Sequence, residues 1–277
     1  MTPVYNAMPY LRDYLECVAA QTYRPLELIL ADDGSSDASV SCIEVYTPRL
    51  EEAGVRVKLL KLPHQNQSAA VNAALKEAGG VFLTWCDADD VMEPECVAKK
   101  AQFLIDHPEI GMVRNDGDVI NGDTGEWMRS SAKEEDRHTQ DIFHALMWET
   151  TYCYAGCYMV RMDLFDLCYP GREIPVSPAG QNLQLLLPPA SRTVCGFIPE
   201  VLHHYYKRSS GHSSQKKSFA MYRERYLALS AMFRAVLPHC ECDREYYEEE
   251  IKKIEKKRMD TIRESLLYWA REEVRKK

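Results

Sequence analysis

A short apolar run that ends in a cluster of carboxylates constrains the fold of this chain most strongly. Residues 81–86 read Val-Phe-Leu-Thr-Trp-Cys, and Asp87, Asp89 and Asp90 follow at once. The run predicts a buried β-strand, and the carboxyl end of a strand is where α/β sheets bind their ligands. Asp87 and Asp89 lie two residues apart, so both carboxylates can face one ligand, and hard oxygens of this kind suit Mg²⁺ or Mn²⁺.

The same carboxylates also have a purely structural interpretation. Asp is favoured at the N-cap of a helix and Pro in its first turn. Asp89 or Asp90 could therefore cap the helix that Pro94 and the run 95–105 predict. Taken alone, the motif favours the cap, and the rest of the chain decides between the two interpretations.

Composition excludes several classes of protein. The 277 residues are 45% hydrophobic and 27% charged, which indicates a folded globular chain with a sizeable core. A net charge of −8 argues against nucleic acid as the main partner, so an anionic ligand would need local basic residues. The ten cysteines show no C-x-x-C pair and are expected to be reduced core thiols. We expect no signal peptide, and no apolar run approaches the length of roughly 18 residues that a membrane span needs. These features predict a cytoplasmic protein, either free or peripheral at the inner face of the membrane.

Strand-like and helix-like patterns alternate before the carboxylate motif. Residues 26–31 and 55–60 predict two buried strands, and the turn 32–37, Asp-Asp-Gly-Ser-Ser-Asp, follows the first of them. Residues 64–75 predict a polar loop that leads into a helix, which a Gly-Gly pair ends. Such β-α repeats predict a mostly parallel sheet with right-handed crossovers, with every polar turn at the carboxyl end of a strand.

The chain opens on a turn that normally follows a strand. Pro3-Val-Tyr-Asn6 precedes a helix predicted for residues 11–18, and only two residues stand before this turn. We therefore expect that a misassigned start codon or a truncation cuts short a strand at the centre of the sheet.

Five short motifs occur in order along the first part of the chain. They are Pro3-Val-Tyr-Asn6, Gln21-Thr-Tyr23, Asp32-Asp-Gly-Ser35, Ser68-Ala-Ala-Val-Asn72 and Asp87-Ala-Asp-Asp90. Each is weak alone, but in this spacing they resemble the nucleotide-binding half of the family-2 glycosyltransferases, which have the GT-A fold. The resemblance implies an α/β sheet flanked by helices. It divides the chain into a nucleotide-sugar-binding half (1–125), an acceptor-binding half (126–215) and a C-terminal helical extension (216–277).

The resemblance also implies roles for residues in these motifs. Tyr5 and Asn6 would lie beside the nucleotide base, and Asp33, with Asp32, would accept hydrogen bonds from its N–H groups. Asp87 would bind the ribose hydroxyls. The expected nucleotide-sugar-binding residues are Pro3, Tyr5, Asn6, Asp32, Asp33, Asn72, Asp87 and Ala88.

Asp89 would hold the metal that bridges the diphosphate. The family often has an Arg before the residue that matches Asn72, whereas this chain has Val71, which puts more of the charge neutralisation on the metal. Plainer roles stay open for the other residues: Asp32 and Asp33 could serve only their turn, and Asn72 could cap its own helix.

A pair of amides, Gln181 and Asn182, occupies the place of the family's Glu-Asp pair at a helix start, whose Asp deprotonates the acceptor. An amide has no proton affinity near neutral pH, so Asn182 cannot be a general base. Another carboxylate could be the base, with Asp116 and Glu149 best placed; Asn182 could orient an acceptor that needs little activation; or the protein could bind nucleotide sugar without transferring it. The intact donor motifs favour the first two. The catalytic candidates are Asp89, Gln181, Asn182 and Asp116.

A basic, Ser- and His-containing loop follows a strand predicted at 194–198. In the family a loop near this place closes over the diphosphate and sometimes gives a His to the metal. Lys207 and Arg208 are therefore expected at the diphosphate, and His212 at the metal beside Asp89. A solvated basic loop is the alternative for each of them.

The later part of the chain predicts an acceptor region and a helical tail. The aromatic run 152–160 predicts a strand, which in the family forms the floor of the acceptor site, although any one aromatic belongs in the core by default. Helices are predicted for 218–236 and for 243–275, and the second carries a narrow apolar stripe. The stripe could pack on the domain, pair with a partner helix or lie on a membrane, and packing is favoured.

These features predict a metal-dependent, inverting glycosyltransferase that uses Mn²⁺ or Mg²⁺. It would move a sugar from a nucleoside-diphosphate sugar, in this family most often a UDP-sugar, to a hydroxyl of a glycan or lipid-linked acceptor in cell-surface polysaccharide biosynthesis. Peripheral membrane association and a homo-oligomer are compatible with this prediction. A catalytically impaired nucleotide-sugar-binding protein is the main alternative. A nucleotidyltransferase is a weaker one, because the chain does not open with a Gly-rich loop that bears Arg or Lys.

Overall fold

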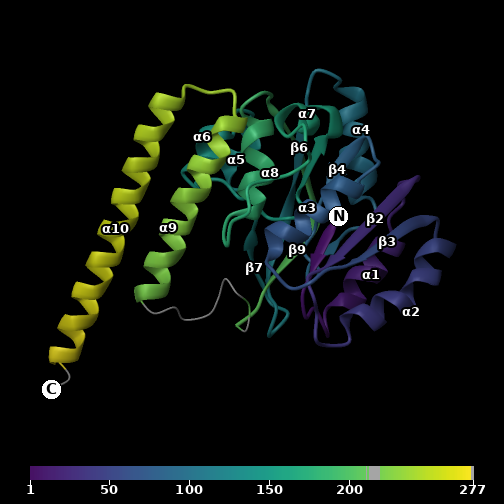
Figure 1. The fold of residues 1–277 in the computed structure, drawn as a ribbon, viewed down its shortest axis with the longest axis horizontal. Helices are drawn as coiled ribbons and strands as arrows, with labels where there is room; N and C mark the ends of the chain where they lie inside the picture. Colours follow the sequence, from purple (N-terminus) through teal and green to yellow (C-terminus); the bar gives the residue numbers. More distant parts are fainter. Residues whose placement is uncertain (210, 212–218, 276–277) are drawn as a thin grey trace.

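The structure, a computed structural model, describes residues 1–209, 211 and 219–275. Its core consists of two β-sheets flanked by helices, and two long helices close to the C-terminus form a hairpin at one side of it (Figure 1). This arrangement agrees with the α/β architecture that the sequence predicts.

Three parallel strands form the N-terminal sheet. In spatial order they are β1 (Thr2–Val4), β2 (Leu26–Asp32) and β3 (Val55–Lys61). The connecting helices are α1 (Leu11–Ala19), α2 (Ser39–Glu52) and α3 (Gln67–Glu77). Parallel strands need such crossovers, because the chain must return to the same edge before it can pair again. The strands predicted at 26–31 and 55–60 are confirmed.

The second sheet has mixed strand directions. Its order is β4-β8-β6-β9-β5, and β7 pairs with β6 at the side. Among the described strands of this sheet, parallel pairing is confined to β6 and β9, and the other pairs are antiparallel. The bounds are β4 (Phe82–Thr84), β5 (Val91–Met92), β6 (Met112–Asn121), β7 (Trp127–Ser130), β8 (Tyr158–Arg161) and β9 (Cys195–Lys207).

The first residues of the chain join the two sheets. The Met1 amine donates a hydrogen bond to Thr84 O (3.0 Å), and Cys86 N–H donates one to Met1 O (3.2 Å). β1 therefore lies between β2 and the end of β4. It has three residues where β2 has seven, and the expectation that it is cut short stays a prediction.

Two predicted strands are shorter than expected. Of the run 81–86, β4 takes up only Phe82–Thr84, because Trp85 leaves the sheet and its carbonyl accepts a hydrogen bond from Gly156 N (2.5 Å). Of the aromatic run 152–160, the strand begins only at Tyr158. The remaining helices are α4 (Cys96–Asp106), α5 (Glu134–His138), α6 (Phe143–Met147), α7 (Met162–Cys168), α8 (Gln181–Ala190), α9 (Phe219–Val236), the 3₁₀ helix η1 (Leu237–His239) and α10 (Arg244–Arg275).

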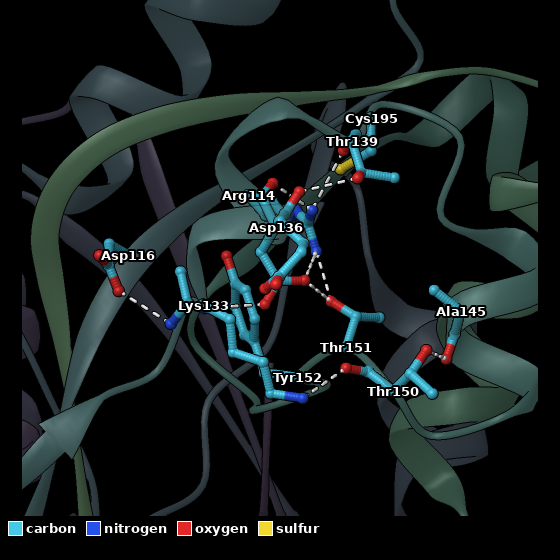
Figure 2. Close-up of polar contacts among 12 residues, drawn as sticks. Arg114, Asp116, Lys133, Asp136, Thr139, Ala145, Thr150, Thr151, Tyr152 and Cys195 are labelled. Carbon is cyan, nitrogen blue, oxygen red and sulfur yellow. Dashed lines mark hydrogen bonds and ion pairs between the residues drawn. The ribbon is translucent and has the colours of Figure 1, made fainter.

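A fully buried arginine fixes the segment that follows β6. Arg114 donates from Nη1 to Thr151 Oγ1 (2.7 Å) and from Nη2 to the carbonyls of Asp136 (2.7 Å) and Thr139 (3.1 Å), as Figure 2 shows. Its guanidinium also lies 5.1 Å from the centre of the Tyr152 ring. A buried charge needs such partners, so this arginine ties α5 and the loop before β8 to the central strand.

α9 and α10 run antiparallel beside each other (Figure 1). Leu229 and Phe233 of α9 are buried, as are Ile251 and Ile254 of α10. The packing predicted for the apolar stripe is therefore confirmed for Ile251 and Ile254. In the part of the chain that the structure describes, no helix has both the length and the apolar character that a membrane span needs.

Candidate active site

The polar turns after the central strands lie side by side. Asp33 N–H donates to Val4 O and Leu62 N–H donates to Asp32 O, each at 2.8 Å, which joins the turns after β1, β2 and β3. Gln67 Nε2, at the start of α3, lies 3.5 Å from Asp87 Oδ1 in the turn after β4. Motifs that are up to about 80 residues apart in the chain therefore border one site, as parallel strands require.

Tyr5 and His64 form a stacked pair at one end of this site. Their ring centres are 4.3 Å apart with 15° between the planes, and half of the Tyr5 surface is exposed. Such a pair offers a flat apolar face of the kind on which a nucleobase can stack. The sequence analysis did not single out His64, because a histidine in a polar loop carries no signal until the fold brings it to Tyr5.

Asp32 and Asp33 are both buried beside this pair. Asp33 Oδ1 accepts a hydrogen bond from Gln65 N (2.8 Å), and Asp33 Oδ2 lies 3.0 Å from His64 Nδ1. Asp32 Oδ2 accepts from Ser35 N (3.1 Å), as the turn interpretation requires, whereas Asp32 Oδ1 is buried with no hydrogen-bond partner among the described residues. A buried carboxylate oxygen without a donor favours a ligand N–H group at this place.

Two asparagines of the motifs have structural contacts. Asn6 has a φ of 49°, and its Oδ1 accepts hydrogen bonds from the backbone of Ser36 (2.8 Å) and Asp37 (3.2 Å), which shapes the turn after β2. Asn72 is buried and exchanges two hydrogen bonds with the backbone of Ile174, at 2.9 and 2.8 Å. Both roles predicted for Asn72 are therefore corrected: it neither faces the site nor caps α3, since its amide holds the loop that leads to α8.

The carboxylates after β4 do not cap the next helix. Glu95 is the N-cap residue of α4, and it makes no side-chain capping bond. Burial, followed by the charges of Asp90 and Asp89, raises the pKa of Asp87 to about 8. Burial and the charge of Asp89 also raise the pKa of Asp90 well above its usual range. Carboxylates that destabilise one another in this way favour a cation beside them.

Asp90 is the most buried of the three carboxylates. Its Oδ1 accepts a hydrogen bond from Tyr206 N (3.1 Å). Its Oδ2 lies 3.4 Å from His203 Nε2 without forming a hydrogen bond, and His203 Nδ1 lies 3.4 Å from Cys157 Sγ. Burial lowers the pKa of His203 to about 3, so this imidazole is neutral and gives the carboxylates no counter-charge.

Arg208 lies directly on the carboxylate motif. Its Nη1 donates to Asp89 Oδ2 at 2.9 Å, and its Nη2 donates to the Asp89 carbonyl at 3.0 Å. Lys207, the last residue of β9, is exposed. Of the basic-loop predictions, the structure thus brings Arg208 to Asp89, while His212 lies outside the described residues.

The carboxylate motif has the chemistry of a divalent-cation site. Its oxygens are hard ligands, burial and then the charges of Asp90 and Asp89 raise the pKa of Asp87, and Asp90 Oδ2 is buried without a hydrogen-bond donor. The described residues contain no group of three or more His, Cys, Asp or Glu side chains that could hold a metal ion. All ten cysteines have free thiols.

The predicted amides lie at the start of α8. Gly180 at the N-cap has a φ of 79°, a backbone conformation that favours glycine, and a Cβ there would lie 2.5 Å from Met232 Cε. Trp85 Nε1 donates a hydrogen bond to Asn182 Oδ1 (2.9 Å), which places this amide beside the strand end that carries the carboxylates. Gln181 Nε2 instead donates to Ser177 O (3.1 Å) in the preceding loop.

Both carboxylates that were predicted as alternative bases have protein partners. Asp116 is buried, and its oxygens accept hydrogen bonds from Ser130 Oγ (2.7 Å) and Arg137 Nη2 (2.5 Å) as well as from two backbone N–H groups. Glu149 forms an ion pair with Arg258 of α10. These contacts favour structural roles, and the identity of the base stays a prediction.

The aromatic run before β8 divides into core and surface residues. Tyr152 and Tyr158 are buried, and their hydroxyls donate to the carbonyls of Asn115 (2.8 Å) and Tyr152 (2.5 Å). Tyr154 is half-buried and stacks on Tyr205, with ring centres 4.5 Å apart. The core role expected by default therefore holds for Tyr152 and Tyr158.

Solved structures with a similar fold include several glycosyltransferases. TarS residues 1–349 of S. aureus, in complex with UDP-GlcNAc, align with a TM-score of 0.62 at 18% identity over 93% of this chain and 70% of that one. The mannosyltransferase PcManGT of Pyrobaculum calidifontis, in complex with GDP-Man and Mn²⁺, aligns with a TM-score of 0.62 at 15% identity over 97% of this chain and 73% of that one. These similarities confirm the GT-A fold.

Sequence relatives and a family profile agree with the fold. An uncharacterized glycosyltransferase of Haemophilus influenzae is 36% identical over 104 residues, which are 37% of this chain and 40% of that protein. The Bacillus subtilis glycosyltransferase TuaG, named for teichuronic acid biosynthesis, is 31% identical over 108 residues, or 38% of this chain and 41% of its own. The matched region thus spans about two fifths of these relatives. The profile described as Glycosyl transferase family 2 matches residues 1–168, so the chain belongs to glycosyl transferase family 2.

Proposed function

We propose that this family 2 glycosyltransferase moves a sugar from a nucleoside-diphosphate sugar to a hydroxyl of a glycan or lipid-linked acceptor, with inversion at the anomeric carbon. Mn²⁺ or Mg²⁺ is the proposed cofactor and a UDP-sugar the proposed donor. The neighbours' ligands, UDP-GlcNAc in TarS and GDP-Man with Mn²⁺ in PcManGT, support a nucleotide sugar as partner. The name of TuaG supports a cell-surface polysaccharide as acceptor.

One observation carries the proposal: the end of β4 and the turn after it contact both sides of the proposed site. Asp87 Oδ1 lies 3.5 Å from Nε2 of Gln67, three residues after His64 of the stacked pair, and Trp85 donates to Asn182 Oδ1 at 2.9 Å. A transferase needs this arrangement, because the anomeric carbon must lie between the leaving diphosphate and the attacking oxygen.

On the donor side, each residue has a role that follows from its contacts. The base stacks on the pair formed by Tyr5 and His64, and Asp32 Oδ1 accepts a hydrogen bond from an N–H group of the base. Asp87 would accept hydrogen bonds from the ribose hydroxyls, and Asp89 would hold the divalent ion. When bound, this ion would neutralise the charge that develops on the leaving diphosphate. Lys207 and Arg208 are the basic residues proposed for the diphosphate.

On the acceptor side, Asn182 orients the acceptor and does not take its proton. Its Oδ1 is held by Trp85, which leaves the Nδ2 group as a donor to an acceptor oxygen. The acceptor oxygen attacks the anomeric carbon while the diphosphate leaves, and the proton goes to a base that Asn182 does not supply. Asp116 and Glu149 both have protein partners, so the proposal assigns the proton to neither of them.

Transfer is tested with a panel of UDP- and GDP-sugars in the presence of Mn²⁺, by measuring the release of free nucleotide with and without glycan acceptors. Asp89→Asn removes a charge at the ion site and keeps the side-chain volume, so it should abolish release, whereas Asp106→Asn, on the exposed end of α4, should not. Full activity of the Asp89→Asn variant with Mn²⁺ would refute the proposed role of Asp89.

A binding protein without transferase activity is the second candidate, because Asn182 replaces the family's base. Nucleotide-sugar binding measured by calorimetry, with no hydrolysis or transfer across a broad acceptor panel, would support this candidate over the transferase. Release of nucleotide that depends on an added acceptor would exclude it.

A further inference from the structure

The guanidinium of Arg208 holds both the side chain and the backbone of Asp89. Nη1 donates to Asp89 Oδ2 (2.9 Å) and to Tyr206 O (3.2 Å), and Nη2 donates to Asp89 O (3.0 Å). A guanidinium can donate from both terminal nitrogens to one partner, and here Nη1 and Nη2 both donate to Asp89. This is a specific contact and not a chance approach of two surface charges.

Two other segments of the chain and a neighbour in its own segment enclose the same side chain. The guanidinium carbon lies 3.8 Å from the centre of the Tyr10 ring, just before α1, and 5.2 Å from that of Tyr206. Gly122, in the turn after β6, leaves room for the arginine, since a Cβ there would lie 2.4 Å from Arg208 Cγ. Only 9% of Arg208 is exposed. The solvated-loop alternative from the sequence is therefore wrong for Arg208.

Arg208 also supplies the positive charge that pairs with the carboxylate motif. His203 Nε2 lies 3.4 Å from Asp90 Oδ2 and forms no hydrogen bond with it. His204 pairs with Glu93 (2.7 Å), and the Lys100 ammonium is directed to the Gly156 carbonyl (2.6 Å). Within the described part of the chain, His203 at Asp90 is the one other side chain able to carry a positive charge that lies within ion-pair distance of Asp87, Asp89 or Asp90.

We propose that Arg208 is an internal counter-ion of Asp89, which a divalent cation must displace from Asp89 Oδ2 in order to bind there. This inference rests on the proposed function, in which Asp89 holds the ion. A coordinated oxygen lies about 2 Å from Mg²⁺ or Mn²⁺ and cannot at the same time keep a full hydrogen bond to a guanidinium at the same lone pairs. The two positive charges also repel each other at this distance. The guanidinium and the divalent ion therefore compete for one oxygen, and the ion pair lowers the affinity of the free protein for metal.

The competition is measured as Mn²⁺ binding to the full chain without nucleotide, by calorimetry or by the EPR signal of free Mn²⁺. Arg208→Gln removes the competing charge and keeps part of the side-chain volume. It should tighten Mn²⁺ binding by at least about fivefold. Arg208→Lys keeps the charge but not the paired N–H groups, and it should give an intermediate affinity.

Two variants serve as controls. Arg56→Gln also removes an arginine that pairs with a carboxylate, Glu27 at 2.7 Å, but on an exposed part of β3. It changes the net charge equally and should leave the Mn²⁺ affinity within about twofold of the unmodified protein. Asp89→Asn should abolish the binding and so assign it to this carboxylate. Circular dichroism reports whether each variant is folded, and Arg208→Lys carries the test if Arg208→Gln is not.

Each outcome decides the inference. Tighter binding in both Arg208 variants, or binding that is measurable only in them, supports the competition. Unchanged or weaker Mn²⁺ affinity in the folded variants overturns it, because Arg208 then does not compete for the oxygen. If no folded form binds Mn²⁺, the inference fails together with the proposed metal site. Acceptor-dependent nucleotide release in the presence of EDTA would then show that the proposed transfer reaction itself still holds.

Discussion

Trp85 Nε1 donates a hydrogen bond to Asn182 Oδ1 over 2.9 Å, and this contact joins the strand end that carries the carboxylates to the start of α8. The indole N–H can only donate, so it holds the oxygen of the amide toward itself. The same geometry would serve a carboxylate in the place of the amide. Asn182 is thus a site where one substitution would add a base without any change of fold.

We predict that Asn182→Asp raises the turnover of the proposed transfer by about tenfold or more. A positioned general base contributes roughly 10² to 10⁴ in rate, and the indole N–H would orient the new carboxylate. The measurement is kcat for acceptor-dependent nucleotide release at saturating donor. The control is Asn121→Asp, since Asn121 Oδ1 accepts from the backbone of Asp123 (3.0 Å) in a surface turn and a carboxylate can do the same there. Equal or lower turnover in Asn182→Asp would mean that acceptor activation does not limit this enzyme.

Breaking the stacked pair of Tyr5 and His64 should lower the affinity of the protein for nucleotide. His64→Ala removes one of two rings whose centres lie 4.3 Å apart, and it should weaken UDP binding by about threefold to tenfold, because ring stacking contributes about 0.5–1.5 kcal/mol. Calorimetric titration with UDP measures this effect. His138→Ala changes an exposed histidine of α5 that pairs with Glu134 (3.1 Å), and it should leave the affinity unchanged. Equal affinities in the two variants would remove His64 from the donor site.

The raised pKa of Asp87 predicts that the metal-free protein loses stability as the pH rises. The pKa is about 8 in the folded protein against an ordinary value of 3.8. Between these two values the folded state keeps a proton that the unfolded chain has lost, so the free energy of unfolding falls with increasing pH. Thermal melts in EDTA should therefore give a lower Tm at pH 8 than at pH 6.

The variant Asp87→Asn tests the origin of this pH dependence. It carries no titrating group at this position, so its Tm should change less between pH 6 and pH 8. Asp106→Asn, at an exposed position of α4, should keep the slope of the unmodified protein. If Asp87→Asn also keeps it, another group is responsible for the loss of stability.

Local patterns predicted the donor half of the fold well, because strands, turns and helices alternate there over short distances. The antiparallel pairs of the second sheet were not predictable in this way, since β4 pairs with β8 through partners such as Leu83 and Val160 that lie far apart in the chain. Asn72 shows the same limit: its partner Ile174 lies 102 residues away, and nothing near Asn72 in the sequence points to it.

The basic loop illustrates how the candidate site was only partly predictable. Lys207 and Arg208 are adjacent and alike in sequence, yet Lys207 is exposed and Arg208 is enclosed. The difference depends on the Tyr10 ring and on the space left by Gly122, which come from two distant segments. Residue type predicted that a positive charge is needed, and the packing decides which of the two residues supplies it.

Of the variants in these predictions, we expect a substitution of Arg114 to cause the largest loss of stability. Arg114→Met keeps an unbranched apolar side chain but removes the guanidinium, which leaves the carbonyls of Asp136 and Thr139 without their donors. The free energy of unfolding should fall by about 3 kcal/mol or more, the usual cost of breaking a buried ionic network from one side. Urea titration measures it, and Arg129→Met, which removes an arginine that donates to Tyr154 Oη at an exposed place, should change it by less than about 1 kcal/mol. If the two variants unfold at the same urea concentration, Arg114 does not stabilise the segment between β6 and β8 as its contacts in Figure 2 indicate.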